Sequence, residues 1–196
     1  MARHYREIHH DAVRIHVPDT TQQTDYSCGA SCLQAVCKYY GVGPDDEWEY
    51  VEALRMDTRV GSHPDQIQRV ANDHDLRFKE YWPMSISQLR AELRKRHPVL
   101  LMIQAYGERE GGLPRLDYRS DWMDGHWVVA IGYDRDAIFF EDPSLQAVRG
   151  YLLDDELAER WHDTARHGRH MEHYGLALWH PRVRRSSYAS KAQRIP

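Results

Sequence analysis

The segment from Gln22 to Leu33 constrains this chain more than any other, because it joins a polar, turn-rich stretch to a helical pattern and puts a cysteine at the junction. From Cys28 onward, apolar residues recur at the spacing of one helix face. These are Leu33, Val36, Cys37 and Tyr40. Ser27 is a candidate N-cap, and Gly41 ends the pattern. The sequence therefore predicts a helix with Cys28 in its first turn.

A cysteine at the start of a helix has the surroundings of a nucleophile. A thiol attacks a carbonyl as its thiolate, and its ordinary pKa is about 8.5. The unpaired N–H groups and the dipole of the first helical turn favour the anion, and a neighbouring imidazolium favours it further. Cys32 and Cys37, later in the same helix, are predicted to be small core residues. Cys28 is therefore the candidate nucleophile.

Residues far downstream supply the other parts of a thiol site. His126 heads a strand-like run, and Gly125 before it leaves room for a close backbone approach. Asp142 ends the next predicted strand, so its carboxylate is placed to bind the second imidazole nitrogen of His126. The side-chain amide of Gln22 and the backbone N–H of Cys28 are candidate oxyanion donors, each typically worth about 3 kcal/mol.

The pattern along the chain gives helices first and mainly strands afterwards. Further helices are predicted at 44–54, 65–74, 86–96 and 154–161. Strands are predicted at 12–18, 76–82, 97–106, 127–133, 137–141, 147–151 and 174–179. This order indicates an α+β domain in which a helical half packs on an antiparallel sheet.

A long loop at 107–125, rich in glycine, acids and arginine, separates two of the predicted strands. Loops of this length in a compact domain are usually functional. We expect it to form one wall of a substrate cleft, with Trp122 and Met123 as apolar contacts. Gly125 and Trp127 are further candidate substrate-binding residues.

Composition and charge narrow the class of protein. The chain has 196 residues, of which 41% are hydrophobic, and a formal net charge of −4, which suits one globular domain. The tail from Arg182 onward contains basic residues but no acids, so the negative net charge lies on the rest of the chain. An acidic body argues against nucleic acid as a partner. We expect one domain at 1–181 and a basic tail at 182–196.

Three features predict a cytoplasmic protein that is not bound to a membrane. The longest aliphatic run, Val99 to Ile103, is too short to cross a bilayer. The first seven residues lack the apolar core of a secretory signal. The three cysteines, all between positions 28 and 37, do not form a disulfide framework and indicate a reducing compartment.

A group of histidines towards the C-terminal end leaves a metal site open as an alternative. The group consists of His162, His167, His170 and His173, with Asp163 among them. Its spacing differs from HExxH and supplies no obvious general base, and the cysteine spacing lacks the CxxC pair of a zinc knuckle. We interpret these histidines, and the His9-His10-Asp11 triplet, as solvated or structural, and predict no metal.

Five motifs together resemble those of the C39 family of cysteine peptidases and its C39-like relatives. They are Gln22-x5-Cys28-Gly29, Tyr39-Tyr40-Gly41, Gly61-Ser62-His63-Pro64, Gly125-His126-Trp127-Val128-Val129 and Asp142-Pro143. The spacing from the cysteine selects Gln22 over Gln23 as the family's glutamine. The stretch from Arg160 to Trp179 matches nothing in the family, and we expect it to shape the substrate pocket.

The resemblance implies a papain-like fold with a site made of the four residues already singled out. It implies Cys28 as nucleophile, His126 as base, Asp142 as its orienting group and Gln22 in the oxyanion hole, with no metal or organic cofactor. The best-known members cut leader peptides after a Gly-Gly pair and are fused to an ABC exporter. This sequence shows neither membrane spans nor a nucleotide-binding motif.

Three functions are consistent with these residues. The first is a thiol hydrolase that cleaves a peptide or isopeptide bond of a peptide or protein substrate through an acyl-enzyme on Cys28. The second is an acyltransferase, in which an amine replaces water in the second step. The third is a non-catalytic peptide-binding module, against which the complete set of four residues argues.

Overall fold

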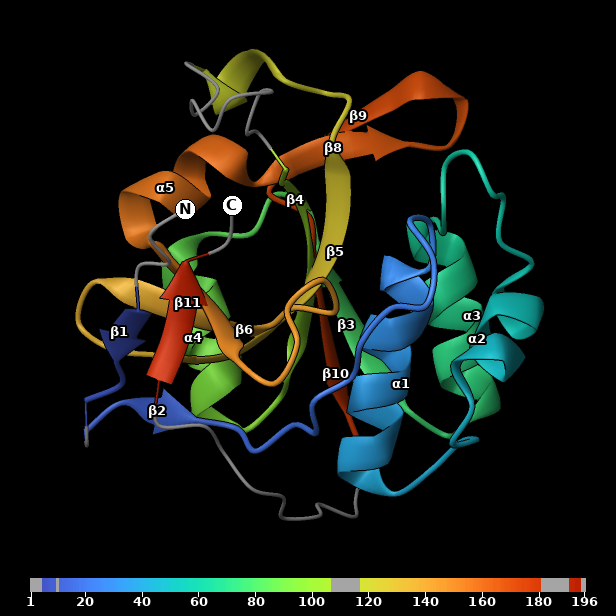
Figure 1. The fold of residues 1–196 in the computed structure, drawn as a ribbon, viewed down its shortest axis with the longest axis horizontal. Coiled ribbons are helices and arrows are strands. Elements are labelled where there is room, and N and C mark those ends of the chain that lie inside the picture. The colour runs from blue at the N-terminus through green and yellow to red at the C-terminus, as the bar shows by residue number, and fades with distance from the viewer. Residues whose placement is uncertain (1–4, 10, 107–116, 181–190, 195–196) are drawn as a thin grey trace.

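The computed structural model describes residues 5–9, 11–106, 117–180 and 191–194, and it shows an α+β fold built around a mixed sheet. The helices are α1 (Cys28–Tyr40), α2 (Glu47–Leu54), α3 (Pro64–Asp73), α4 (Ile86–Arg94) and α5 (Asp154–Arg160). The 3-10 turns are η1 (Tyr118–Ser120) and η2 (Arg166–Gly168). The α1–α3 group lies on one side of the sheet, and α4 and α5 lie on the other (Figure 1).

The main sheet has the strand order β1-β11-β7-β6-β5-β4-β10-β3, with β2 also paired to β5. Its strands are β1 (Tyr5–Glu7), β2 (Val13–Arg14), β3 (Arg77–Tyr81), β4 (Val99–Gln104), β5 (Gly125–Tyr133), β6 (Ala137–Glu141), β7 (Arg149–Leu153), β10 (Gly175–Trp179) and β11 (Lys191–Arg194). The β11–β7 pair is parallel and the other pairs are antiparallel. A separate hairpin joins β8 (His162–Ala165) to β9 (Arg169–Glu172).

Helix α1 is the most buried helix, because α2 and α3 cover one side and the sheet covers the other. All of its residues except Lys38 are buried. Its ends are fixed by local chemistry, since Gly41 closes it at a left-handed φ of 71°. Ser27 occupies the predicted N-cap position, but its hydroxyl donates to the carbonyl of Thr24. The helix start is thus held by the preceding turn.

Two contacts set α1 against the sheet. The Tyr40 hydroxyl donates to the carbonyl of Leu178 in β10 over 3.0 Å, and the Cys32 thiol donates to the carbonyl of Trp127 in β5 over 3.2 Å. Strands β4 and β5 are buried along nearly their whole length, as expected for central strands covered on both faces. The first turn of α1 is therefore held near the first residues of β5.

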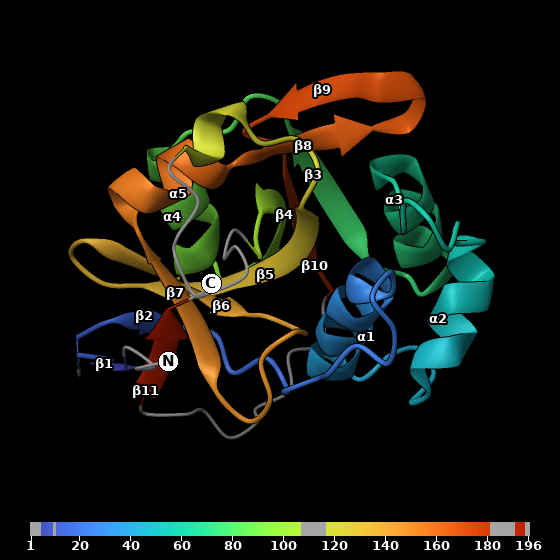
Figure 2. The ribbon, with the colours of Figure 1, turned by 45° about the horizontal axis from the view of Figure 1, so that its top comes forward.

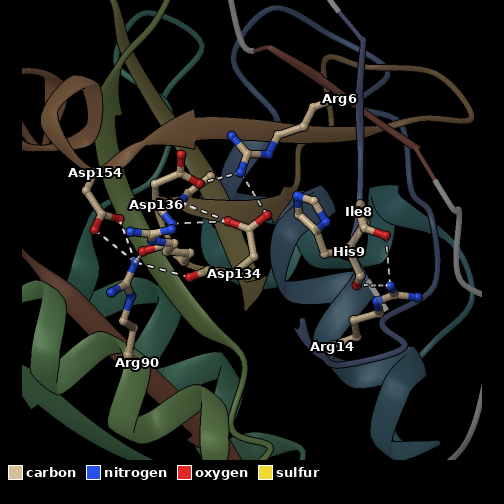
Figure 3. A network of polar contacts seen from close by, with 10 residues as sticks. Arg6, Ile8, His9, Arg14, Arg90, Asp134, Asp136 and Asp154 are labelled. Carbon is tan, nitrogen blue, oxygen red and sulfur yellow. Dashed lines mark hydrogen bonds and ion pairs between the residues drawn. The ribbon is translucent and has the colours of Figure 1, made fainter. Parts of the chain in front are cut away.

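A polar network ties the N-terminal strand to the turn between β5 and β6 (Figure 3). The Arg6 guanidinium donates to Asp134 over 2.9 Å and also to Asp136. In the same region, Arg90 of α4 pairs with Asp154 over 2.8 Å. These contacts join the start of the chain to α4 and to the start of α5.

The predicted helices and most predicted strands are confirmed, with ends shifted by a few residues. The strand expected at 147–151 runs from Arg149 to Leu153, and the one expected at 12–18 shortens to Val13–Arg14. Among the strands, β1, the β8–β9 hairpin and β11 were not predicted, and β11 lies in the expected basic tail. The remainder of that tail at 182–190 and most of the expected loop at 107–125 lie outside the described residues.

Among the helices of the described residues, none has both the length and the apolar character needed to span a bilayer.

Candidate active site

Strand pairing brings a thiol, an imidazole and a carboxylate together at one end of the sheet. Cys28 is the first residue of α1, His126 is the second residue of β5, and Asp142 directly follows β6, the neighbour of β5. The three are buried, with 8%, 2% and 0% of their surface exposed. The elements to which these residues were assigned from the sequence therefore meet in the fold.

Asp142 holds the His126 ring in one orientation. His126 Nε2 lies 2.8 Å from Asp142 Oδ1, which also accepts hydrogen bonds from the Ser144 backbone N–H and hydroxyl over 2.9 and 2.8 Å. Because Nε2 is committed to the carboxylate, Nδ1 is the nitrogen left for other partners. It lies 3.1 Å from the Tyr106 hydroxyl.

The charge of Asp142 keeps His126 protonated. Burial disfavours the imidazolium, but the Asp142 charge and the hydrogen bonds with Asp142 and Cys28 outweigh it and raise the pKa of His126 to about 10. His126 in turn keeps the pKa of Asp142 below its ordinary value, although burial acts in the opposite direction. The pair therefore presents a cationic N–H group beside Cys28.

The other two cysteines have the opposite environment. Cys32 and Cys37 are completely buried in the core, as the sequence predicted. Burial raises the pKa of Cys32 well above its ordinary value and that of Cys37 to about 12. Cys28, in contrast, lines a cavity at the surface of the protein.

Gly29 lets the start of α1 approach the loop before α3. A Cβ at this position would lie 2.0 Å from the Ser62 hydroxyl oxygen and 3.1 Å from Cδ1 of Trp127. Trp127 is buried, and its indole N–H donates to the carbonyl of Ser62 over 3.0 Å. The structure thus places Trp127 beneath the cleft, where it supports the loop, and not among the residues that line the cavity.

Gln22 lies next to the Asp142 loop, and its side chain is hydrogen-bonded within the turn that precedes α1. Its backbone N–H donates to the carbonyl of Pro143 over 2.9 Å, and its side-chain amide donates to the carbonyl of Thr24 over 2.8 Å. It lines a cavity of about 450 Å³ that also contacts Tyr106. An amide NH₂ has two donor hydrogens, so the Thr24 contact leaves one of them available.

A larger cavity of about 800 Å³ lies beside Cys28. The 58–63 loop, residues 122–125 and the β8–β9 hairpin contribute its walls. Trp122, Met123 and Gly125 are among its lining residues, and Met123 is 85% exposed. The end of the long loop therefore does form one wall of a cavity at the candidate nucleophile.

The hairpin crosses from the sheet towards α3 (Figures 1 and 2). At its tip, the Arg166 guanidinium lies 3.3 Å from the Asp65 carboxylate in the first turn of α3. At its base, the His170 ring stacks on Trp122 with centroids 3.8 Å apart and an interplanar angle of 12°. The hairpin is thus attached at both ends of the cavity.

Contacts within the protein account for most of the histidine group that left a metal site open. His162 Nε2 lies 2.7 Å from the carbonyl oxygen of Asp121, His170 stacks on Trp122, and the His173 ring stacks on Trp161. Within the part of the chain that the structure describes, no group of three or more His, Cys, Asp or Glu side chains is arranged to hold a metal ion. Of the other triplet, His10 lies outside the described residues.

Two residues of this region were missed by the sequence reasoning. Tyr106 lies two residues beyond β4, in which Ile103 pairs with His126, and its hydroxyl comes within 3.1 Å of His126 Nδ1. This register could have been found by aligning the two predicted strands. Asp163, noted only as part of the histidine group, lines the large cavity, and no pattern in the sequence indicated the hairpin that carries it.

Comparison with known proteins agrees with this geometry. The sequence profile described as the Peptidase_C39 like family matches residues 14–168. A structure described as a C39-like peptidase from Bacillus anthracis is 15% identical with a TM-score of 0.64, covering 88% of this chain and 99% of that one. No curated protein sequence matches the chain.

Two further solved structures share the fold. A double-glycine-motif protease from an AMS/PCAT transporter, in complex with the leader peptide, is 18% identical with a TM-score of 0.54, covering 84% of this chain and 92% of that one. The peptidase domain of Streptococcus ComA is 15% identical with a TM-score of 0.55, covering 82% and 94%. These likenesses show a C39-type papain-like fold. With the profile match over most of its length, the chain belongs to the peptidase C39-like family.

Proposed function

We propose that this protein is a cysteine peptidase that cleaves a peptide or isopeptide bond through an acyl-enzyme on Cys28. The observation that carries the proposal is the His126–Asp142 pair at the start of α1. It fixes Nε2 on the carboxylate over 2.8 Å and leaves Nδ1 as the nitrogen available to the thiol. A hydrogen bond between Cys28 and His126 is one of the causes that raise the pKa of His126.

In the first half-reaction, the Cys28 sulfur attacks the substrate carbonyl carbon as a thiolate beside protonated His126. The backbone N–H of Cys28 and the second amide hydrogen of Gln22 are the proposed donors to the oxyanion. When the tetrahedral intermediate collapses, the C–N bond breaks and His126 gives its proton to the departing amine. The acyl group stays on Cys28 as a thioester.

In the second half-reaction, His126 accepts a proton from water, and the hydroxide attacks the thioester carbonyl. The C–S bond then breaks, which releases the carboxylic acid and restores the thiolate–imidazolium pair. Asp142 stabilises the imidazolium in both half-reactions and keeps the ring from turning. Trp122, Met123 and Gly125 are proposed to contact the substrate, because they line the cavity that contains Cys28.

The test is the pH dependence of thiol alkylation, followed by mass spectrometry of the peptides that carry each cysteine. We expect iodoacetamide to modify Cys28 at about pH 5.5, well below the ordinary thiol pKa of about 8.5. His126→Ala should abolish this reactivity at acid pH. His162→Ala, which removes a histidine bound to a backbone carbonyl, is the matched control and should retain it.

Cys32 and Cys37 serve as internal controls because both are buried and have raised pKa values. If Cys28 reacts no faster than an ordinary thiol, or if Cys32 reacts first, the peptidase proposal fails. A second assay uses a peptidic acyl donor, with and without an added amine. It distinguishes hydrolysis of the acyl-enzyme from transfer of the acyl group to an amine. Hydrolysis without an added amine supports a peptidase, whereas product formation that requires the amine contradicts it.

A further inference from the structure

Asp163 places a carboxylate in the wall of the large cavity, directly beside the backbone that precedes His126. Its side chain approaches Gly125 so closely that a Cβ on Gly125 would lie 2.3 Å from both carboxylate oxygens. Gly125 and His126 are consecutive, so their Cα atoms are about 3.8 Å apart. Cys28 and Asp163 also line the same cavity, so a substrate that occupies this cavity at Cys28 is exposed to the Asp163 carboxylate.

Among the described residues, only one oxygen of this carboxylate accepts hydrogen bonds. Oδ1 accepts the Thr164 backbone N–H over 2.7 Å and the Gln104 side-chain amide over 3.3 Å. Both donors are uncharged, and Asp163 takes part in none of the ion pairs found among the described residues. Oδ2 remains as an acceptor in the wall of the cavity.

The surroundings of Asp163 make a negative charge there unfavourable. Burial raises its pKa to about 6, in spite of the two hydrogen bonds to Oδ1. The charge of His126 lowers this pKa, but the described residues form no hydrogen bond or ion pair between the two side chains. Near neutral pH the group is therefore mainly a half-buried carboxylate without a cation in direct contact. Such a carboxylate gains more from an added cation than an exposed one does, because the local dielectric is low.

The charges of the cavity are divided between its walls. Asp25 and Asp124 also line it, and Asp124 directly precedes Gly125 and His126 in the chain. The arginines of the lining lie on the α3 side. Arg59 is exposed in the loop before α3, and Arg166 is paired with an acid of α3. The wall next to His126 is therefore the acidic one.

We propose that Asp163 determines substrate specificity by binding a cationic group, an ammonium or a guanidinium, on the substrate residue next to the scissile bond. The proposal rests on the proposed peptidase function of Cys28. The cation would occupy the open Oδ2 position and give Asp163 a charge partner in direct contact. Gly125 would be required at its position because any side chain there would occupy the space of the carboxylate.

Thiol reagents of different charge test the carboxylate without knowledge of the substrate. The cationic reagent is 2-(trimethylammonium)ethyl methanethiosulfonate, and the anionic one is 2-sulfonatoethyl methanethiosulfonate. The ratio of their rates at Cys28 is measured by mass spectrometry for wild type and Asp163→Asn. We expect the cation-to-anion ratio to fall about tenfold in the variant, equivalent to about 1.4 kcal/mol.

The matched control is Asp25→Asn, which removes one negative charge from an exposed position on the same cavity. Its ratio should change by less than about twofold, since exposed charges are screened. An unchanged ratio in Asp163→Asn overturns the proposal. An equal fall in both variants overturns it as well, because it would show only the general field of the cavity.

Cleavage of synthetic peptides then tests the substrate specificity during turnover. Internally quenched peptides that differ only in lysine, norleucine or glutamate at each position around the cleaved bond are compared with wild type and Asp163→Asn. We expect lysine to be preferred at one position, and the variant to lose that preference by raising KM for the lysine peptide. If peptides are cleaved without a lysine preference, the proposed role of Asp163 is contradicted, but the peptidase function is not. If no peptide is cleaved while the reagent ratio still falls, the peptidase function fails and the cation-binding carboxylate stands.

Discussion

At the scale of single residues, Asp142 acts on His126 through charge as well as through orientation, and the two effects can be separated. Asp142 Oδ1 accepts three hydrogen bonds, whereas Oδ2 is buried without a partner among the described residues. In Asp142→Asn, the amide oxygen can take the place of Oδ1 and the NH₂ group that of Oδ2. The variant should therefore keep the ring orientation and lose only the charge.

We predict that Asp142→Asn lowers the pKa of His126 by more than one unit, because the charge that offsets burial is gone. The measurement is an NMR titration of ¹³C-labelled histidine in a Cys28→Ala background, so that the thiol does not titrate. Asp136→Asn, which changes an exposed carboxylate of the β5–β6 turn, is the control. An unchanged midpoint for His126 would show that Asp142 has no electrostatic role.

The sequence predicted Cys28, His126 and Asp142, which the fold brings together, but missed two of the residues around them. Cys28, His126 and Asp142 lie at the ends of elements with strong periodic signals, and their spacing along the chain follows from short connections. Tyr106 and Asp163 come into the site through strand register and a hairpin crossing. Neither follows from local spacing, because each depends on which strands pair in three dimensions.

At the scale of elements, the two strands of the β8–β9 hairpin are attached to the rest of the protein in different ways. The hairpin forms a separate two-stranded sheet, and such a ribbon is marginally stable by itself. The Trp122–His170 stack attaches one strand, and an exposed ion pair between Arg166 and Asp65 attaches the tip. In β8, the carbonyl of His162 accepts a hydrogen bond from the Gln104 amide over 3.0 Å, and in β9 the Arg169 guanidinium lies over the Trp82 ring. The exposed ion pair contributes little, so the stack should be a main attachment of β9.

We predict that Trp122→Ala increases local opening of the hairpin while the rest of the fold keeps its stability. Loss of an aromatic pair worth about 1 kcal/mol should speed amide exchange in β9 about fivefold. Peptide-resolved hydrogen–deuterium exchange measures this, with Trp48→Ala, a partly exposed tryptophan of α2, as control. Equal acceleration in α1 and β5 would instead indicate global destabilisation.

The hairpin also shows why some elements escape sequence analysis. Its strands carry one buried apolar residue, Met171, among polar and charged ones, so the alternation that marks a half-buried strand is missing. Strand β11 is similar, since its sequence is Lys191-Ala-Gln-Arg194 and its place in the sheet comes from pairing with β1 and β7. Strands β4 and β5, which are apolar along most of their length, were predicted.

At the scale of the whole molecule, the edge of the sheet is joined to α4 by one buried carboxylate. Glu92 of α4 accepts hydrogen bonds from Tyr81 at the end of β3 and from Lys95, each over 2.7 Å. His97, which precedes β4, lies 2.8 Å from its other oxygen. Burial opposes the charge, but the bonds from Lys95, Tyr81 and His97 outweigh it and lower the pKa of Glu92 to about 2.

The lowered pKa fixes the sign of its effect on stability. The pKa of Glu92 is 4.5 in its ordinary environment and about 2 in the fold, so the unfolded chain takes up its proton first as pH falls. The stabilisation by Glu92 is therefore complete above about pH 5 and is lost as the pH falls towards 2. It is the same charge that holds Lys95 and His97 against the end of the helix.

We predict that Glu92→Gln lowers the free energy of unfolding by about 2 kcal/mol at pH 7 and by much less at pH 3. Urea unfolding followed by circular dichroism at several pH values measures the difference. Glu52→Gln, which changes an exposed acid of α2 that forms no ion pair among the described residues, should leave the free energy within about 0.5 kcal/mol of wild type at each pH. A Glu92→Gln penalty that does not depend on pH would place the effect in packing instead of charge. The Glu92 cluster would then not be what makes the fold sensitive to acid.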